Sequence, residues 1–171
     1  MAYTTPRTWV TGELVTAAFM NANVRDNVSF LANPPTCLVY HNATQSIANN
    51  TFTPAAFNSE TNDTDTMHDT VTNNTRITFK TAGIYIITFN CAWPTNGVGE
   101  RQVNFFLNNT ADIAGDSKAS AGVTGDVRHS VTHKDKFAVN DYIEARVFQN
   151  SGGALVLQVN PRFTATWIGL G

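Results

Sequence analysis

The stretch Ile84-Tyr85-Ile86-Ile87-Thr88-Phe89-Asn90-Cys91-Ala92-Trp93 alternates between two kinds of side chain, and this alternation decides the fold class. Successive residues of a β-strand point to opposite faces of its sheet, so the period-two pattern predicts a strand. One face of this strand is apolar and the other is mixed. The apolar row is Tyr85, Ile87, Phe89, Cys91 and Trp93, and the mixed row is Ile84, Ile86, Thr88 and Asn90.

Further segments from Thr36 onward also have strand-like sequence and are separated by turn-forming residues such as Thr81-Ala82-Gly83 and Ser151-Gly152-Gly153. Many short strands, without a second helix or an internal repeat, predict an all-β antiparallel sandwich or barrel. The other predicted strands are 37–41, 76–80, 102–108, 128–133, 142–149, 155–159 and 162–170.

The first 33 residues have a helical pattern instead. Thr16 is a suitable N-cap for a helix over 17–31, and Pro34-Pro35 would end it. Such a helix is either a terminal helix packed on its own domain or a docking segment that binds another subunit. We favour docking because two heptads are too short for an independent coiled coil. The chain is thus divided into a docking segment, 1–35, and a head, 36–171. The residues assigned to docking are Trp9, Leu14, Phe19, Met20, Val24, Asn27 and Leu31.

Composition excludes several function classes. Charged residues make up only 14% of the chain and the net charge is −2, with Lys and Arg scattered, so nucleic-acid binding is not expected. No window is apolar enough for membrane insertion, and the N-terminus does not resemble a signal peptide. We therefore expect synthesis in a cytoplasm, where Cys37 and Cys91 would be buried free thiols.

The mixed row of 84–93 is unusual because it begins with Ile84 and Ile86, and Ile168 continues the same feature in the last strand. The outer face of an isolated sandwich is normally polar because it meets water. An apolar outer face therefore indicates that something covers it, and subunits around a symmetry axis would do so.

Three segments of the head resemble the tumour necrosis factor and complement globular domains. These are 75–89, with an aliphatic-Tyr pair after Gly83, then 140–145, with Asn140 where that family has glycine, and 163–170. The resemblance implies a ten-strand jelly roll and a homotrimer. It also places Cys37 and Cys91 in one sheet with the closing strand between them, roughly 9–10 Å apart and too far for a disulfide. The residues it places at the threefold axis are Ile84, Ile86, Thr88, Asn90, Thr164, Thr166 and Ile168.

The segment from Thr5 to Asn27 resembles the leader of tailed-bacteriophage virion proteins. Its shared features are Trp9, then Gly12-Glu13, Thr16-Ala17-Ala18 and Arg25-Asp26-Asn27. In those proteins a common start precedes variable remaining parts, as expected of an attachment segment. The resemblance implies a virion location.

No catalytic, cofactor or metal site is expected. The acidic residues of 62–69 lack the complete calcium-loop spacing and fit Asx-turns in a polar surface loop. Glu100 and Arg101 are interpreted as solvated charges at the start of a strand. The sequence has no Gly-x-Ser-x-Gly motif and no phosphate-binding loop. The four histidines show no paired metal spacing and are interpreted as surface or subunit-contact residues: His41, His68, His129 and His133.

These patterns predict a non-enzymatic, homotrimeric virion surface protein, docked by its N-terminal segment with the jelly roll facing outward. A capsid decoration or head-fibre role is slightly favoured because the sequence has no long fibre domain. A tail-tip receptor-binding protein is the close alternative, and a surface carbohydrate-active enzyme is a less favoured one. The expected partners are other capsid or tail proteins of the virion and a host surface glycan or protein.

Overall fold

The computed structural model describes residues 3–120, 122 and 125–171. It divides the chain into two compact units, Met1–Pro34 and Pro35–Gly171, each of which is described by itself. In the described part of the chain, no helix is long and apolar enough to cross a membrane.

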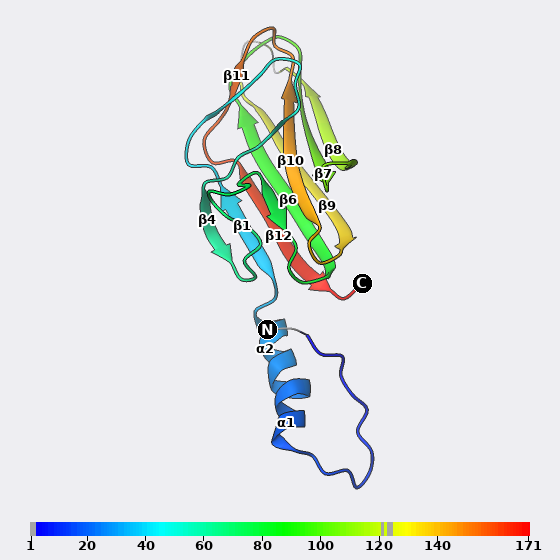
Figure 1. Cartoon of the computed structure of the whole chain (residues 1–171). Coiled ribbons are helices and arrows are strands. Elements are labelled where there is room, and N and C mark those ends of the chain that lie inside the picture. The colour runs from blue at the N-terminus through cyan, green and yellow to red at the C-terminus, as the bar shows by residue number, and fades with distance from the viewer. Residues whose placement is uncertain (1–2, 121, 123–124) are drawn as a thin grey trace. The chain divides into compact units, whose positions relative to one another are not determined.

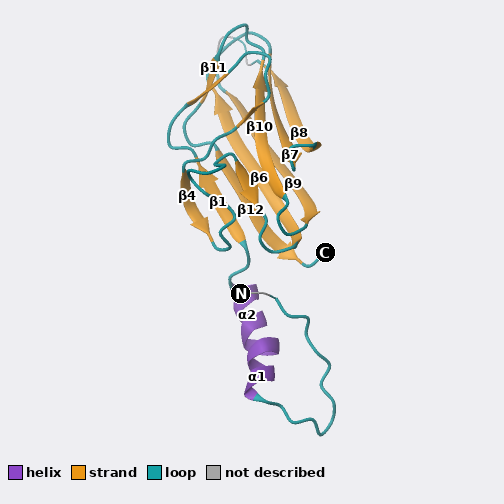
Figure 2. Ribbon diagram, in the orientation of Figure 1, coloured by secondary structure: helices purple, strands orange, loops and turns teal. Residues whose placement is uncertain are grey.

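The N-terminal unit is built around one helical run (Figures 1 and 2). It begins with α1 (Ala17–Met20), continues through a π-helical turn (Asn21–Arg25) and ends with α2 (Asp26–Ala32). The Thr16 hydroxyl accepts a hydrogen bond of 3.3 Å from the backbone N–H of Phe19, which caps the first turn. The helix predicted for 17–31 is therefore present, with a wider turn at its centre.

The head is a sandwich of two antiparallel sheets, and its described residues place five strands in each sheet. The first sheet has the order β4-β1-β12-β6-β9, and the second has the order β3-β10-β7-β8 with β5 also paired to β10. The strands of the first sheet are β4 (Ser59–Asp63), β1 (Thr36–Tyr40), β12 (Arg162–Gly169), β6 (Gly83–Trp93) and β9 (Val127–Phe137). Those of the second are β3 (Thr53–Pro54), β10 (Tyr142–Gln149), β7 (Glu100–Leu107), β8 (Ala111–Ala119) and β5 (Arg76–Thr78). A short additional pair consists of β2 (Gln45–Ile47) and β11 (Leu155–Leu157). This arrangement confirms the predicted all-β jelly roll.

The core lies between the two sheets and is rich in aromatic rings. The apolar row of β6 is buried as its alternation predicts. Phe163 of β12 faces Phe105 of β7 across the sandwich, with ring centroids 5.6 Å apart. Phe79 stacks on Phe137 at 4.1 Å. Such contacts between strands distant in sequence bring the two sheets together.

The backbone positions of Gly83 and Asn140 explain why these two residue types stand there in the sequence. Gly83 is the first residue of β6, and a Cβ atom at this position would lie 2.1 Å from the Trp167 indole nitrogen, so only glycine fits. Asn140 occupies the turn before β10 with a φ of 72°, in the left-handed region that asparagine tolerates better than most residues. Asn140 can therefore hold a turn conformation that most other residues would adopt only with strain.

Four strands were not predicted: β2, β3, β4 and β8. β4 has the sequence SETND and β8 the sequence ADIAGDSKA, neither of which has an apolar row. Both are edge strands, where one side of the backbone is unpaired and polar residues are common. Asn62 and Asp63 accordingly end β4 rather than lying in a surface loop.

Candidate interaction surfaces

The seven residues assigned to the trimer interface share the outer face of the first sheet. In the register of this sheet, Thr164 of β12 is paired with Thr88 of β6, and Thr166 is paired with Ile86. The Ile86 and Ile168 side chains are 38% and 44% exposed in the single chain. The structure therefore brings these residues together on one surface, and their role at a threefold axis stays a prediction.

Hydroxyl groups and a basic edge surround the isoleucines of this face. The Thr36 and Thr166 hydroxyls lie 3.3 Å apart. Beyond β6, the partners of Ile86 and Ile84 on β9 are Lys134 and Lys136. A neighbouring subunit that covers this face must therefore match an apolar and hydroxyl-rich centre and a cationic edge.

Most of the residues assigned to docking are exposed within the N-terminal unit. The exposed members are Trp9, Leu14, Phe19, Met20, Val24 and Leu31. The remaining member, Asn27, is only 6% exposed, because its side-chain amide accepts a hydrogen bond from Thr4 N–H and donates one to the Thr4 carbonyl. Asn27 thus holds the start of the segment against the helix, whereas the apolar members form a surface.

Arg7 joins two of these apolar residues. Its guanidinium lies 4.7 Å from the centroid of the Trp9 ring and 4.4 Å from that of the Phe19 ring, and it is paired with Glu13. The two rings are in edge contact at 6.3 Å. This arrangement orders the non-helical segment before the helix, which lowers the entropic cost of presenting the rings to a partner.

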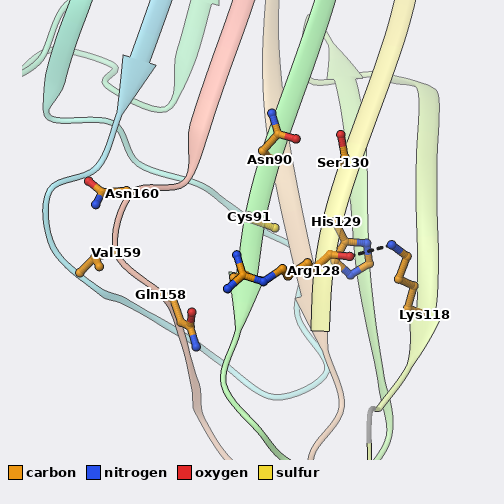
Figure 3. A pocket seen from close by; sticks show the side chains of 10 residues that line it. Asn90, Cys91, Lys118, Arg128, His129, Ser130, Gln158, Val159 and Asn160 are labelled. Carbon is orange, nitrogen blue, oxygen red and sulfur yellow. Dashed lines mark hydrogen bonds between the residues drawn. The ribbon is translucent and has the colours of Figure 1, made fainter. Parts of the chain in front are cut away.

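A cavity of about 550 Å³ opens at one end of the outer face of the first sheet (Figure 3). Its cationic side chains are Lys118 and Arg128, and Lys118 Nζ donates a hydrogen bond of 2.6 Å to the Arg128 carbonyl. β6, β8, β9 and the loop before β12 all contribute. The lining residues are Asn90, Cys91, Ala92, Lys118, Arg128, His129, Ser130, Gln158, Val159 and Asn160.

His129 and Asp116 connect the two sheets beside this cavity. The His129 ring is 2% exposed, and its Nδ1 lies 2.9 Å from Asp116 Oδ2. Burial lowers the pKa of His129 despite the neighbouring carboxylate, so its neutral form donates through Nδ1–H. Burial acts to raise the pKa of Asp116, but hydrogen bonds from His129 and Lys118 lower it. The prediction that His129 is a surface or subunit-contact residue is therefore wrong, because its side chain lies on the inner face of β9 and contacts Asp116 of β8.

Cys91 is the register partner of His129, which places a thiol, an imidazole and a carboxylate close together. Burial raises the pKa of Cys91 to about 12, so the thiol is almost fully protonated near neutral pH. His129 Nε2 is also buried and has no hydrogen-bond partner among the described residues. This set lacks the activated thiolate and the thiol–imidazole hydrogen bond that nucleophilic catalysis requires.

The acidic region organises the backbone. Asp63 accepts hydrogen bonds from the N–H groups of Asp65 and His68, and Asp69 accepts them from Val71 and Thr72, as expected for Asx-turns. The described residues contain no group of three or more histidine, cysteine or acidic side chains placed to hold a metal ion.

His68 departs from the prediction of a surface or contact histidine. Its side chain is fully buried in the single chain, with ring nitrogens 2.9 Å from Glu60 Oε1 and 3.3 Å from the Asn74 carbonyl. It therefore links β4 to the loop before β5.

Arg101 also departs from the sequence prediction. It was expected to be solvated, but it is fully buried in the inner row of β7, beside Trp93 at 6.0 Å. Its Nη1 donates to the Val98 and Glu100 carbonyls at 3.0 and 2.9 Å. Burial lowers the pKa of this guanidinium.

The outer face of the second sheet has an aromatic cluster that sequence reasoning missed. Phe52 lies 5.0 Å from Phe148 of β10 and 6.2 Å from Phe106 of β7, measured between ring centroids. Arg146 lies over the Phe106 ring at 4.4 Å and donates a 3.1 Å hydrogen bond to Glu144. The alternation of 142–149 could have identified Arg146 and Phe148 as outer residues, but only the fold brings Phe52 to them.

Comparisons with known proteins support the fold alone. No protein-family description and no curated protein matches the chain in sequence. Among solved structures, Eiger TNF from S. frugiperda is similar with a TM-score of 0.62 at 8% identity, over 80% of this chain and 95% of that one. The globular domain of zebrafish complement 1qA protein is similar with a TM-score of 0.64 at 13% identity, over 80% and 98%. The chain therefore has a tumour-necrosis-factor-like jelly roll.

Proposed function

We propose that this chain is a non-enzymatic, homotrimeric surface protein of a tailed-bacteriophage virion. Its N-terminal segment docks it to the particle and its jelly roll faces outward. Capsid decoration or a head fibre is the first assignment. A tail-tip receptor-binding protein is the alternative.

The N-terminal unit carries the virion assignment. Its leader-like sequence, from Thr5 to Asn27, resembles the start of phage virion proteins. Its apolar side chains lie exposed around an ordered helix, as a docking surface requires, while Asn27 and Arg7 hold the preceding segment in place. Burying each large side chain against a partner would contribute about 1.5–3 kcal/mol. Three copies in one trimer would strengthen attachment through a high effective concentration.

The outer face of the first sheet supports the trimer. Ile84, Ile86 and Ile168 share this face with threonine hydroxyls that already pair with one another, so few polar groups would lose partners on burial. The tumour-necrosis-factor-like fold is compatible with a threefold assembly through this sheet.

The chemistry of the cavity in Figure 3 favours a structural role over catalysis. Its thiol has a pKa of about 12 and its histidine is committed to Asp116. The alternative from another class, a surface carbohydrate-active enzyme, is tested by incubating the protein with host cell-wall or capsular polysaccharide. Shortened chains in size-exclusion chromatography would contradict the non-enzymatic assignment.

Gold labelling of the protein on intact phage particles tests the location. Label on the capsid surface in electron micrographs is the expected result, and label at the tail tip would select the alternative. Particles without label, although the protein is made in the infected cell, would contradict the virion assignment.

A further inference from the structure

We propose that the outer face of the second sheet binds a neutral saccharide chain, in a groove over β7 and β8 next to the Phe52 aromatic cluster. This inference deepens the proposed attachment function by naming a ligand class, and it rests on that function for its biological setting. Saccharide binding can be measured on the isolated protein, without the phage particle.

The groove has a volume of about 480 Å³ and a polar lining. Asn104 Nδ2 donates a hydrogen bond of 2.6 Å to Asp112 Oδ2, so the amide and the carboxylate are held at a fixed spacing. This hydrogen bond uses Asn104 Nδ2 and Asp112 Oδ2, so the Oδ1 atoms of both side chains can accept hydrogen bonds from a ligand. The lining residues are Gln102, Asn104, Asp112, Ile113, Ala114, Gly115, Asp116 and Ser117.

Gly115 makes room for this arrangement. It is the register partner of Asn104, and a Cβ atom at Gly115 would lie 2.7 Å from Asn104 Nδ2 and 2.8 Å from the Val103 carbonyl. Any larger residue would therefore displace the Asn104 side chain from the groove floor. The absence of a side chain at this position leaves the amide room to lie beside Asp112.

Phe106 connects the groove to an aromatic surface. It is the register partner of Asp112 on one side and of Glu144 on the other. Phe52 lies on Phe106 and Phe148 and is itself 40% exposed, so part of its ring is accessible to a ligand. An exposed ring beside fixed hydrogen-bonding groups can bind the C–H face of a sugar while those groups bind its hydroxyls.

Arg146 stiffens this surface. Its guanidinium lies over Phe106, its Nε donates to Glu144 Oε2, and the Thr75 hydroxyl donates to Glu144 Oε1 at 2.9 Å. Arg146 also donates to Asn109 Oδ1. Because these contacts fix the side chains before a ligand arrives, less conformational entropy is lost on binding.

The charges select a neutral ligand. Asp112 and Asp116 line the groove, and no lysine or arginine among the described residues lines it. The Asp116 carboxylate is paired with His129 and Lys118, and the Arg146 charge is balanced by Glu144, so Asp112 supplies the negative charge of the groove. A uronic or sialic acid would be repelled, whereas neutral hexoses supply hydroxyl donors for the carboxylate and amide oxygens. The site is also on the sheet opposite to the proposed trimer face, so assembly through the first sheet leaves it free.

The test is affinity electrophoresis of the full-length protein in gels that contain dextran, yeast mannan or arabinogalactan, with polygalacturonate as the acidic comparison. We expect retardation in at least one neutral gel and none in polygalacturonate. Phe52→Ala and Asp112→Ala should each weaken the apparent affinity at least five-fold. Val156→Ala is the matched control, because Val156 is also 40% exposed but lies on β11.

Three results would overturn the site: no retardation in any neutral gel, retardation that both variants preserve, or retardation in polygalacturonate alone. A change in oligomeric state caused by Phe52→Ala would also overturn it, by making the cluster a protein interface. If Phe52→Ala fails to fold, Asp112→Ala alone tests the site. Asp112 is an exposed residue of an edge strand, so its replacement should not disturb folding. Loss of glycan binding with normal trimers and normal particle docking would remove only this site, not the proposed function.

Discussion

The hydroxyl oxygens of Thr88 and Thr132 lie 3.0 Å apart across β6 and β9, on the outer face of the first sheet. Thr164 extends the row from β12, where it is paired with Thr88 and donates to the Thr88 carbonyl at 3.4 Å. The polar groups of this row are thus satisfied within one chain. A neighbouring subunit can cover the row without leaving unpaired hydroxyl groups, which makes this face suitable for a subunit interface.

Ile86→Asp tests that interface. Ile86 lies one row from Thr88, and an aspartate there would place an unpaired carboxylate in each of three symmetry-related contacts. Such burial costs several kcal/mol per site, so we expect a monomer or an aggregate in light scattering. Val156→Asp, at an exposed position of β11, is the control and should assemble normally. A variant at Ile86 with an unchanged assembly would show that this face is not the interface.

Deletion of Met1–Asn33 tests docking. The chain divides into compact units at Pro34–Pro35, and the core of the head uses residues beyond that point. We expect a soluble, β-rich head with a melting temperature within a few degrees of the full chain, which no longer co-sediments with particles. Leu31→Asp in the full chain should reduce docking and leave head stability unchanged. A truncated head that precipitates, melts far lower or still binds particles would contradict the docking role.

The two thiols should be free and unreactive in the native protein. Cys37 and Cys91 are both buried, and burial raises the pKa of Cys37 above its usual range and that of Cys91 to about 12. Cys37 is paired with Ala165, whose partner Ile87 is four residues from Cys91, so the cysteines are separated by two strand spacings and about 13 Å along the strand. They therefore lie farther apart than was expected from the sequence, because their strands are also offset along the sheet. Denaturing, non-reducing alkylation should modify both, as read by mass spectrometry. A mass deficit of about 2 Da with unmodified cysteines would mean a disulfide.

Stability should fall in acid because of His129. Its folded-state pKa is lowered, so the unfolded chain binds the extra proton first as the pH falls below about 6.5, and the folded state is progressively destabilised. The lowered pKa of Asp116 causes a further loss of folding stability as the pH falls below about 3.8. Denaturant titrations between pH 7.5 and about pH 5 should show a smaller pH dependence in His129→Gln than in wild type. Ser130→Ala, on the outer face of the same strand, should keep the wild-type slope, and an unchanged slope in His129→Gln would contradict this assignment.

The sequence predicts the jelly roll well because buried strands carry their own alternation, as in β6 and β12. It predicts the edge strands poorly, because β4 and β8 have no apolar row. Arg101 was assigned to solvent and His129 to the surface or a subunit contact because of their residue types. Each, however, lies two residues from a valine of the buried row of its strand, and this alternation indicated an inward side chain. The partner of His129 could not be predicted, because Asp116 belongs to the other sheet and only the closed sandwich brings them together.

The molar mass of the full-length protein distinguishes the proposed homotrimer from a monomer. Sedimentation equilibrium over a wide concentration range gives this mass independently of shape. We expect a single species of three times the chain mass of 18.6 kDa. A single species at 18.6 kDa throughout that range would contradict it.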